Sequence, residues 1–444
     1  MLREVGSTGW VTKQFSDIFH GGIGVFFRKV RYAGRQVRYV QILNGVWAIP
    51  AVWLMRAARP IVHIRVGTIF STRIGHFVAD ATEQVTVLAR QPANTLDWYW
   101  LGPTCNQQWE IMVRRTLTVR WWVKYLDWWN GVLPGGSEHT RPTSFTNSRD
   151  IDGLFMQFDA RIPLLEAESN AAQAWLEAQG WRVGEPFVCL LVRDSAYLNH
   201  DPLHGLGENN DPLRWQYHDY RDSDIESYLP AVTWLASQGV WVLRMGKIMA
   251  RPFPENLDHV IDYAFDPTRS DLLDIWLFAN CSGCITTASG PDALAWVYAK
   301  PLLYLNALPM GNLHSFSHSI WVPKHLIWSA DGTPFALSEY LVQGLWQTQS
   351  YDELGVGIID LDPDEILEAV QEFWKRIEGT WVDTPIQQDR QKKFWCAFQA
   401  WPDFSQYHGW LHPETRVGDA WLASRRAGFL EDDPRDAMGS VSDR

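Results

Sequence analysis

Residues 281–306 (CSGCITTASGPDALAWVYAKPLLYLN) constrain the fold most, because they follow the order strand, small-residue turn, helix and strand. Residues 283–287 hold an isoleucine and two threonines, which favour a buried strand. Pro291 suits the first turn of a helix, where an amide hydrogen is not needed, and Ser289 or Gly290 can cap that helix. The segment therefore predicts a βαβ unit of a parallel sheet.

The turn in this segment also predicts an anion site. Free backbone amides and the positive end of the helix dipole favour a phosphate at such a turn, and the hydroxyls of Thr287 and Ser289 can add hydrogen bonds. A nucleotide pyrophosphate would fit there. The alternative is an ordinary crossover with a well-capped helix and no ligand.

Strand-like and helix-like segments alternate along most of the chain. Strands separated by helices predict parallel sheets covered on both faces, and hence an α/β fold. The expected strands are residues 61–70, 95–101, 118–126, 187–192, 240–244, 259–263 and 283–287. The expected helices are residues 77–88, 106–117, 163–180, 225–238, 271–280, 363–379 and 385–402.

A length of 444 residues suits two domains with an appendage. Residues 133–149 are rich in Gly, Pro, Ser and Thr and predict a long loop. The expected parts are a basic amphipathic arm (1–60), an N-terminal Rossmann-like domain (61–180), a C-terminal Rossmann-like domain (181–380), C-terminal helices (381–432) and a disordered tail (433–444).

A turn near the N-terminus holds Arg73, Gly75 and His76 between an expected strand and helix. Ligands of open α/β sheets lie at the carboxyl ends of strands, so a histidine on this turn is placed to touch a substrate. His76 could serve as a general base. The alternative is a histidine at a helix start that faces solvent.

The strand at 187–192 is followed at its carboxyl end by Arg193, Asp194, Ser195 and Tyr197. The planar guanidinium of an arginine binds two phosphate oxygens at once and stays charged, so Arg193 suits a phosphate. The alternative is a structural pair of Arg193 with Asp194.

The following loop contains His218 and Arg221, for which the sequence suggests no simple structural role. Asp222-Ser-Asp224 matches a D-x-D metal pattern, but Ser223 or Asp224 as a helix cap explains it without metal. Arg244 and Gly246 end the next strand and add a cation and a glycine turn to the same edge of the sheet.

Composition narrows the classes of partner. A formal charge of −12 argues against nucleic acid, and five cysteines without a disulfide pattern suit a reducing cytoplasm. Cys281 and Cys284 lack a second pair at zinc spacing and are expected to fill the core, so no structural metal is indicated. The 26 tryptophans can stack on sugars or simply fill the core.

The N-terminal region is basic although the protein is acidic. Residues 18–79 contain no Asp or Glu, and they contain nine cations. The uncharged stretch 40–55 is too short to span a membrane and contains Pro50. We predict peripheral attachment to an anionic membrane surface through basic side chains, Trp47 and Trp53. The alternative is a buried helix with solvated arginines.

Several motifs together resemble a bacterial family assigned as glycosyltransferases of surface-polysaccharide clusters. They are VRDSAYL (192–198), YHDYRDSDIESYLPA (217–231), VLRMGK (242–247), TTASGPDALAWVYAKPLLYLN (286–306) and WVPKHL (321–326), and the resemblance covers most of residues 61–350. It implies a GT-B architecture with two Rossmann-like domains, a nucleotide sugar bound mainly by the C-terminal half, and usually no metal.

More distant resemblances concern single turns. ASGPDALAWVYAKP resembles the D-x-G-P-x-x-L-A turn of heptosyltransferases, and RIGHF resembles their R-x-G-D turn, whose acid serves as base. His76 stands at the position of that acid. VRDS resembles the strand end of fucosyltransferases that use a GDP sugar, with Arg193 as the matching arginine.

These observations predict a cytoplasmic, inverting, metal-independent glycosyltransferase without a cofactor. His76 would be the catalytic base that accepts the proton of a glycan or lipid-linked acceptor. Acceptor-side candidates are Arg73, Gly75 and Asp80, and donor-binding candidates are Arg193, Ser195, His218, Arg221, Arg244, Gly246, Thr287, Ser289, Gly290 and Asp292. The alternatives are a nucleotide-sugar epimerase or hydrolase of the same fold and a non-catalytic carbohydrate-binding protein.

Overall fold

The computed structural model describes residues 39–141, 149–197, 216–341, 345 and 347–430. The chain forms two compact units. The smaller unit takes the chain up to residue 68 with residues 92–100 and 119–141, and the larger unit takes residues 69–91, 101–118 and 142–444.

The larger unit is built on a seven-stranded sheet in which every pair of neighbouring strands is parallel. Its order is β11-β8-β7-β6-β3-β4-β5. The strands are β3 (Phe187–Leu191), β4 (Trp241–Arg244), β5 (Val260–Ile261), β6 (Gly283–Thr286), β7 (Leu302–Leu305), β8 (Ser319–Val322) and β11 (Arg416–Val417). The predicted α/β fold with a parallel sheet is confirmed.

The central strands are apolar because helices cover both faces of the sheet. Every residue of β3, β4, β6 and β7 is buried, and Cys189 of β3 lies in register with Leu243 of β4 and Cys284 of β6. Cys281 and Cys284 are both buried free thiols, as predicted for core-filling residues.

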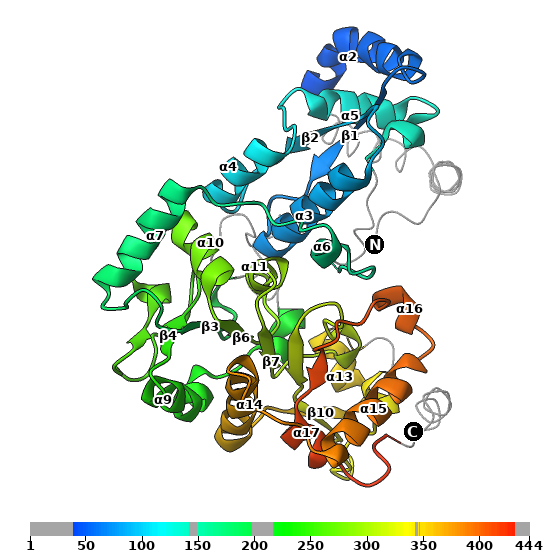
Figure 1. The fold of residues 1–444 in the computed structure, drawn as a ribbon. Coiled ribbons are helices and arrows are strands. Elements are labelled where there is room, and N and C mark those ends of the chain that lie inside the picture. The colour runs from blue at the N-terminus through cyan, green and yellow to red at the C-terminus, as the bar shows by residue number, and fades with distance from the viewer. Residues whose placement is uncertain (1–38, 142–148, 198–215, 342–344, 346, 431–444) are drawn as a thin grey trace, which may run out of the picture. The chain divides into compact units, whose positions relative to one another are not determined.

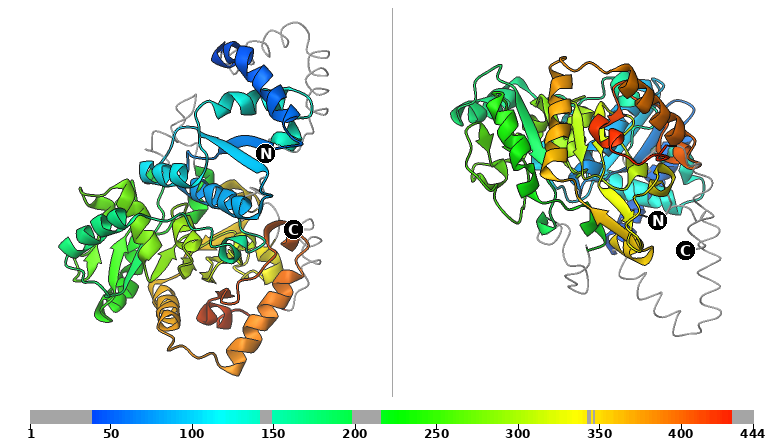
Figure 2. Two further views of the ribbon diagram at one scale, coloured as in Figure 1. Left: turned by 45° about the horizontal axis from the view of Figure 1, so that its top comes forward. Right: turned by 90° about the horizontal axis from the view of Figure 1, so that it is seen from below.

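Helices form a layer on each face of this sheet (Figure 1), and the turned views show the same two layers (Figure 2). One layer holds α7 (Glu166–Ala178), α10 (Asp271–Asn280) and α11 (Asp292–Val297), and the other holds α9 (Leu229–Ser237) and α14 (Pro363–Ile377). Two further helices of the larger unit, α3 (Ile74–Arg90) and α4 (Gln107–Thr116), pack against α11 and α10 respectively. These contacts bring the start of α3 to the β6–α11 turn.

The remaining elements of the larger unit are short or peripheral. β9 (His325–Trp328) and β10 (Val356–Ile359) form an antiparallel pair. The other helices are α6 (Leu154–Gln157), α12 (Leu337–Tyr340), α13 (Thr348–Glu353), α15 (Pro385–Gln399), α16 (Phe404–Tyr407) and α17 (Asp419–Ala423), with 3₁₀ turns η2 (Gln216–Arg221), η3 (Ile225–Tyr228), η4 (Tyr263–Phe265) and η5 (Met310–Asn312).

The smaller unit contains α2 (Tyr39–Ala57), β1 (His63–Ile69), β2 (Thr95–Leu101), α5 (Val123–Val132) and η1 (Gly136–His139), although the ends of β1 and β2 continue into the larger unit. β1 and β2 pair, and Arg65 of β1 forms two hydrogen bonds with the buried carboxylate of Asp97, at 2.6 and 2.7 Å. Ala48, Val52 and Met55 of α2 pack in one apolar cluster with residues of α5.

One expected element of the smaller unit is wrong. Residues 118–126 were expected as a strand, but only Val119 makes a parallel bridge, to Tyr99, and α5 starts at Val123. The reason is that Val123, Leu126 and Asn130 recur at helical spacing and are buried together against α2. The other predicted strands and helices exist, with bounds shifted by a few residues.

Three predicted regions lie wholly or partly outside the described residues. They are the basic arm (1–60) up to residue 38, the loop (133–149) at residues 142–148, and the whole tail (433–444). Within the described part of the chain, no helix combines the length and the apolar character that crossing a membrane requires.

Candidate active site at the switch point of the parallel sheet

The strand order of the large sheet marks a binding position. Counted from β3 along the chain, the order is 3-2-1-4-5-6 with β11 added at the edge, so the order reverses between β3 and β6. Open α/β sheets bind ligands in the crevice outside the carboxyl ends of the strands at such a reversal. A cavity of about 600 Å³ lies there, and all its lining residues belong to the larger unit.

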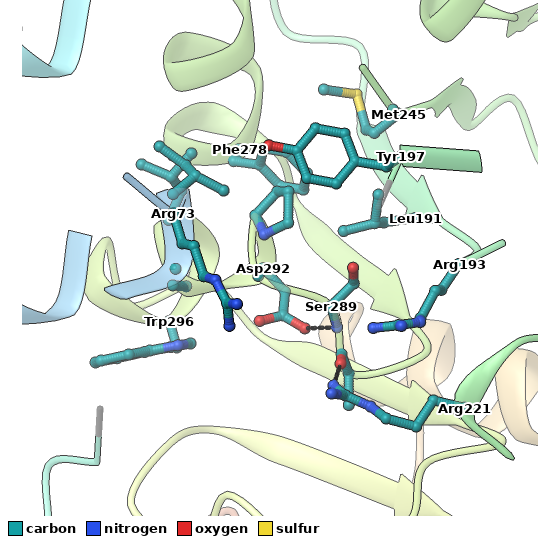
Figure 3. Close-up of a pocket in the computed structure, with 18 of the residues that line it drawn as sticks. Arg73, Leu191, Arg193, Tyr197, Arg221, Met245, Phe278, Ser289, Asp292 and Trp296 are labelled. Atoms are coloured by element: carbon teal, nitrogen blue, oxygen red, sulfur yellow. Dashed lines mark hydrogen bonds between the residues drawn. The ribbon is translucent and has the colours of Figure 1, made fainter. Parts of the chain in front are cut away.

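The β6–α11 turn forms one wall of the cavity (Figure 3). Asp292 closes the turn: its carboxylate accepts hydrogen bonds from the Thr286 hydroxyl at 3.0 Å and from the Ser289 amide at 2.8 Å. Ala288 takes a left-handed backbone conformation, with φ of 57°. Burial raises the pKa of Asp292 to about 7. The turn is thus fixed without a ligand.

Arg193 reaches the cavity from the carboxyl end of β3. Its backbone amide donates to the hydroxyl of Thr287 at 3.0 Å, and its Nε donates to the carboxylate of Asp222 at 2.9 Å. The predicted alternative partner, Asp194, instead accepts from the amides of Ala196 and Ala250. Asp222 therefore orients the guanidinium beside the cavity.

Arg221 lies next to Arg193 and also lines the cavity. It donates to the carbonyl oxygen of Ala288, and its Nε is buried without a hydrogen-bond partner among the described residues. Burial, followed by the charge of Arg193, lowers its pKa. Two neighbouring guanidinium groups, of which only Arg193 has a carboxylate partner among the described residues, favour an anion in the cavity.

Beside the β6–α11 turn, the start of α3 forms another side of the cavity, with Arg73, Gly75 and His76. The ring of His76 packs edge-on against Phe70, with 5.1 Å between the ring centres. Burial and, to a lesser extent, the charge of Arg73 lower the pKa of His76 to about 4. His76 is therefore neutral at physiological pH, with a lone pair that can accept a proton, although burial makes it a weaker base than an ordinary histidine.

The cavity collects most of the predicted site residues. Its lining includes Arg73, Gly75, His76, Arg193, Arg221, Gly246, Ser289, Gly290 and Asp292. Thr287 is buried behind this surface, where it holds Arg193, and Asp80 is buried where it accepts a hydrogen bond from the Phe70 amide at 2.8 Å. Ser195 is exposed outside the lining, and the side chain of His218 lies outside what the structure describes.

Arg244 is not brought to the cavity, which corrects its assignment as a donor-binding residue. Its side chain is buried, pairs with Asp262 at 3.2 Å and donates to the carbonyl of Arg251 at 3.0 Å. The parallel pairing of β4 with β5 explains this, because it brings Asp262 beside the end of β4. Gly246 and Lys247, two and three residues later, line the cavity instead.

The D-x-D pattern is explained without metal. Asp224 is the N-cap of η3 and accepts from the amide of Glu226 at 3.2 Å, while Asp222 pairs with Arg193. In the described residues, no group of three or more His, Cys, Asp or Glu side chains is arranged to hold a metal ion.

Sequence reasoning missed one part of the cavity, around Arg149. This guanidinium donates to the backbone carbonyls of Tyr407 at 2.7 Å, Asn312 at 2.8 Å and Leu313 at 2.5 Å. Burial lowers its pKa to about 9. Nearby His314 is hydrogen-bonded to Tyr304 at 2.6 Å. The sequence carried no local signal, because Arg149 ends a loop and its partners, three backbone carbonyls and the ring of His408, lie more than 160 residues away.

The backbone of Gly75 closely approaches that of Gly290, and a substitution can test this contact. An ideal Cβ on Gly75 would lie 2.8 Å from the carbonyl oxygen of Gly290. We expect Gly75→Ala to lower the free energy of unfolding by about 1–3 kcal/mol, because the two turns must move apart. Urea denaturation would measure it. In the control Gly131→Ala, within α5, no atom lies within 4 Å of the added Cβ, and stability should rise by up to about 1 kcal/mol. Equal stability of the two variants would contradict the close approach.

No protein-family model matches the sequence, and no curated protein matches it. Among solved structures, E. coli ADP-heptose LPS heptosyltransferase II is 12% identical, with 71% of this chain and 100% of that chain covered and a TM-score of 0.39. A glycosyl transferase family 9 structure from Veillonella parvula is 12% identical, with 59% and 86% covered and a TM-score of 0.37. E. coli heptosyltransferase WaaC with ADP is 10% identical, with 59% and 91% covered and a TM-score of 0.32. At these TM-scores the similarities assign neither a family nor an activity to this chain.

Proposed function

We propose that the protein is a glycosyltransferase that binds a nucleotide sugar in the cavity at the switch point, where the strand order reverses between β3 and β6. It moves the sugar to an acceptor hydroxyl. The observation that carries the proposal is the pair Arg193 and Arg221 beside the β6–α11 turn at the carboxyl ends of β3 and β6. Cations on such an edge suit the diphosphate of a nucleotide sugar.

The composition of the cavity suggests how the donor lies. Leu191, Met245 and Phe278 provide apolar surface on the side of β3, β4 and α10, which suits the flat base of a nucleoside. The diphosphate would lie between the two arginines and the Ser289–Gly290 backbone. The sugar would then extend toward α3, where His76 lines the cavity.

The proposed reaction is a direct displacement with inversion. The acceptor oxygen forms a bond to the anomeric carbon while the bond from that carbon to the diphosphate oxygen breaks. His76 takes the proton of the acceptor hydroxyl, and Arg193 and Arg221 stabilise the negative charge that grows on the departing diphosphate. The two arginines supply the positive charge that a divalent metal ion supplies in metal-dependent transferases. The reaction is therefore proposed to be metal-independent and cofactor-free.

A binding screen tests the donor half of this proposal. UDP, GDP, CMP, ADP and dTDP would be titrated into the full chain by thermal shift and calorimetry, with and without magnesium, and each parent nucleoside would serve as the control without phosphate. We expect one nucleotide to bind with unchanged affinity in EDTA and its nucleoside to bind at least about tenfold more weakly, since hydrogen bonds to charged groups contribute about 1.5–3 kcal/mol.

Other outcomes would redirect the proposal. Silence across all five nucleotides would contradict a nucleotide-sugar donor and favour a non-catalytic carbohydrate-binding protein. Rapid consumption of the matching nucleotide sugar without an acceptor would favour an epimerase or hydrolase of the same fold.

A further inference from the structure

The helix α2 of the smaller unit has two apolar faces, one buried and one exposed. One face is buried: Ala48, Val52 and Met55 are each less than 5% exposed and pack in the cluster shared with α5. The other face is exposed to solvent along the length of the helix. Its members are Ile42 (51%), Leu43 (72%), Val46 (84%), Trp47 (40%), Trp53 (53%) and Leu54 (72%).

The exposed apolar face of α2 is continuous. These side chains recur at spacings of three, four and seven residues, so they form one continuous stripe. Soluble proteins rarely leave contiguous apolar patches of several large side chains in water, and such patches mark sites of interaction with proteins or membranes.

Two polar side chains at this stripe, Trp47 and Asn44, are hydrogen-bonded within the helix. The indole of Trp47 donates to the side-chain oxygen of Asn44 at 2.6 Å, and the amide of Asn44 donates to the carbonyl of Val40 at 2.6 Å. Moving this face into an apolar medium therefore leaves these donors paired, which removes the main cost of such a transfer.

The charges around the helix identify the partner. Residues 18–79 contain no Asp or Glu in a chain of net charge −12, and Arg28, Lys29, Arg31, Arg35 and Arg38 precede α2 directly in sequence, outside the described residues. At the other end of the helix, the guanidinium of Arg56 lies over the ring of Trp53, 5.3 Å from its centre, while its nitrogens donate to the side chain of Asn130 and the carbonyl of Pro134. Aromatic and basic side chains flanking an apolar stripe suit the headgroup level of an anionic bilayer.

We propose that α2 docks on an anionic lipid surface with its axis in the plane of the membrane and with the stripe from Ile42 to Leu54 in the interface. The buried face stays on α5, so the helix is already folded before it binds. This inference is independent of the reaction proposed for the cavity, because it rests only on the smaller unit and the sequence before it.

The test is vesicle co-sedimentation of the full chain. Vesicles of phosphatidylcholine with 30% phosphatidylglycerol would be compared with vesicles of phosphatidylcholine alone. The face variant is Leu43→Ser, Val46→Ser, Leu54→Ser. The matched control is Val183→Ser, Val382→Ser, Ile386→Ser, which removes the same kind of side chain at similar exposure (67%, 84% and 70%) from the larger unit. Deletion of residues 1–58 is less suitable, because it would also remove Ala48, Val52 and Met55 from the core.

We expect the wild type and the control to prefer anionic vesicles by about tenfold or more, with the preference falling in 1 M salt. The face variant should bind them at least about tenfold more weakly. Circular dichroism would verify that both variants keep their helix content. The proposal is overturned if the wild type ignores both vesicle types or if the face variant and the control sediment equally. It is also overturned if the wild type is a dimer that does not bind vesicles and the face variant is a monomer. In that case the stripe would be the contact surface between two copies of the chain.

Discussion

Replacing Arg193 with alanine should weaken the binding of the matching nucleoside diphosphate by about 100-fold. The guanidinium lines the cavity at the switch point and donates to Asp222, while the backbone amide of Arg193 donates to the Thr287 hydroxyl. Charge-assisted hydrogen bonds to a diphosphate contribute about 1.5–3 kcal/mol each, which corresponds to a factor of about ten to more than 100 in affinity. Calorimetry should show a larger dissociation constant for the nucleoside diphosphate. The dissociation constant of the parent nucleoside should be the same for the variant and the wild type.

The ion pair of Arg193 complicates this substitution, because its loss leaves the partly buried Asp222 carboxylate without its cation. An unpaired carboxylate near the cavity would repel a diphosphate by itself. The double variant Arg193→Ala, Asp222→Asn separates the two effects. Restored affinity in the double variant would show that Arg193 acts only by neutralising Asp222, and it would place the diphosphate elsewhere.

A matched control is available on the surface. Arg251 forms ion pairs with Asp224 and Glu226 and does not line the cavity, so Arg251→Ala removes the same charge from the same unit. Its affinity for the nucleotide should stay within about twofold of the wild type, because interactions between exposed charges are screened by salt. An equal loss in Arg193→Ala and Arg251→Ala would indicate a long-range charge effect instead of a contact.

The sequence predicted β3 to β7 of the large sheet because these strands are short, largely apolar runs between polar turns, but it predicted neither β8 nor β11. Such runs mark strands buried on both faces, and helices between them require parallel pairing. The order of the strands in the sheet could not be predicted from the sequence. It depends on which helix covers which face, and only the order shows that Arg193 and Ser289 meet at the reversal between β3 and β6.

The failures have local physical causes. Residues 118–126 mix aromatic and β-branched side chains, which favour a strand, yet burial against α2 imposes a helix from Val123. Arg244 ends its strand at the correct edge, but its side chain pairs with Asp262, which directly follows β5, and does not line the cavity. Arg149 gave no local signal, since its environment is formed by carbonyl groups distant in sequence.

The assignment of His76 as the base predicts an unusual pH dependence. An ordinary histidine has a pKa near 6.5, and burial together with Arg73 lowers that of His76 to about 4. The neutral form that accepts a proton therefore persists as the pH falls from 8 to about 5. If His76 is the base, kcat/KM, which reports the free enzyme, should stay level over this range and fall only as the pH approaches about 4. Burial raises the pKa of Asp292, which also lines the cavity, to about 7, so a loss of activity below pH 7 would instead point to that carboxylate.

Substitution of His76 should then separate catalysis from binding. His76→Ala should lower kcat by about 100-fold or more and leave the donor dissociation constant nearly unchanged, because the imidazole acts on the acceptor proton and not on the diphosphate. His76→Asp places a carboxylate at the same point of α3 and should recover part of the lost turnover. A merely structural histidine would give a different pattern, in which alanine and aspartate reduce turnover equally and stability falls with it. An unchanged kcat in His76→Ala would remove His76 as the base and leave Asp292→Asn as the next variant to measure.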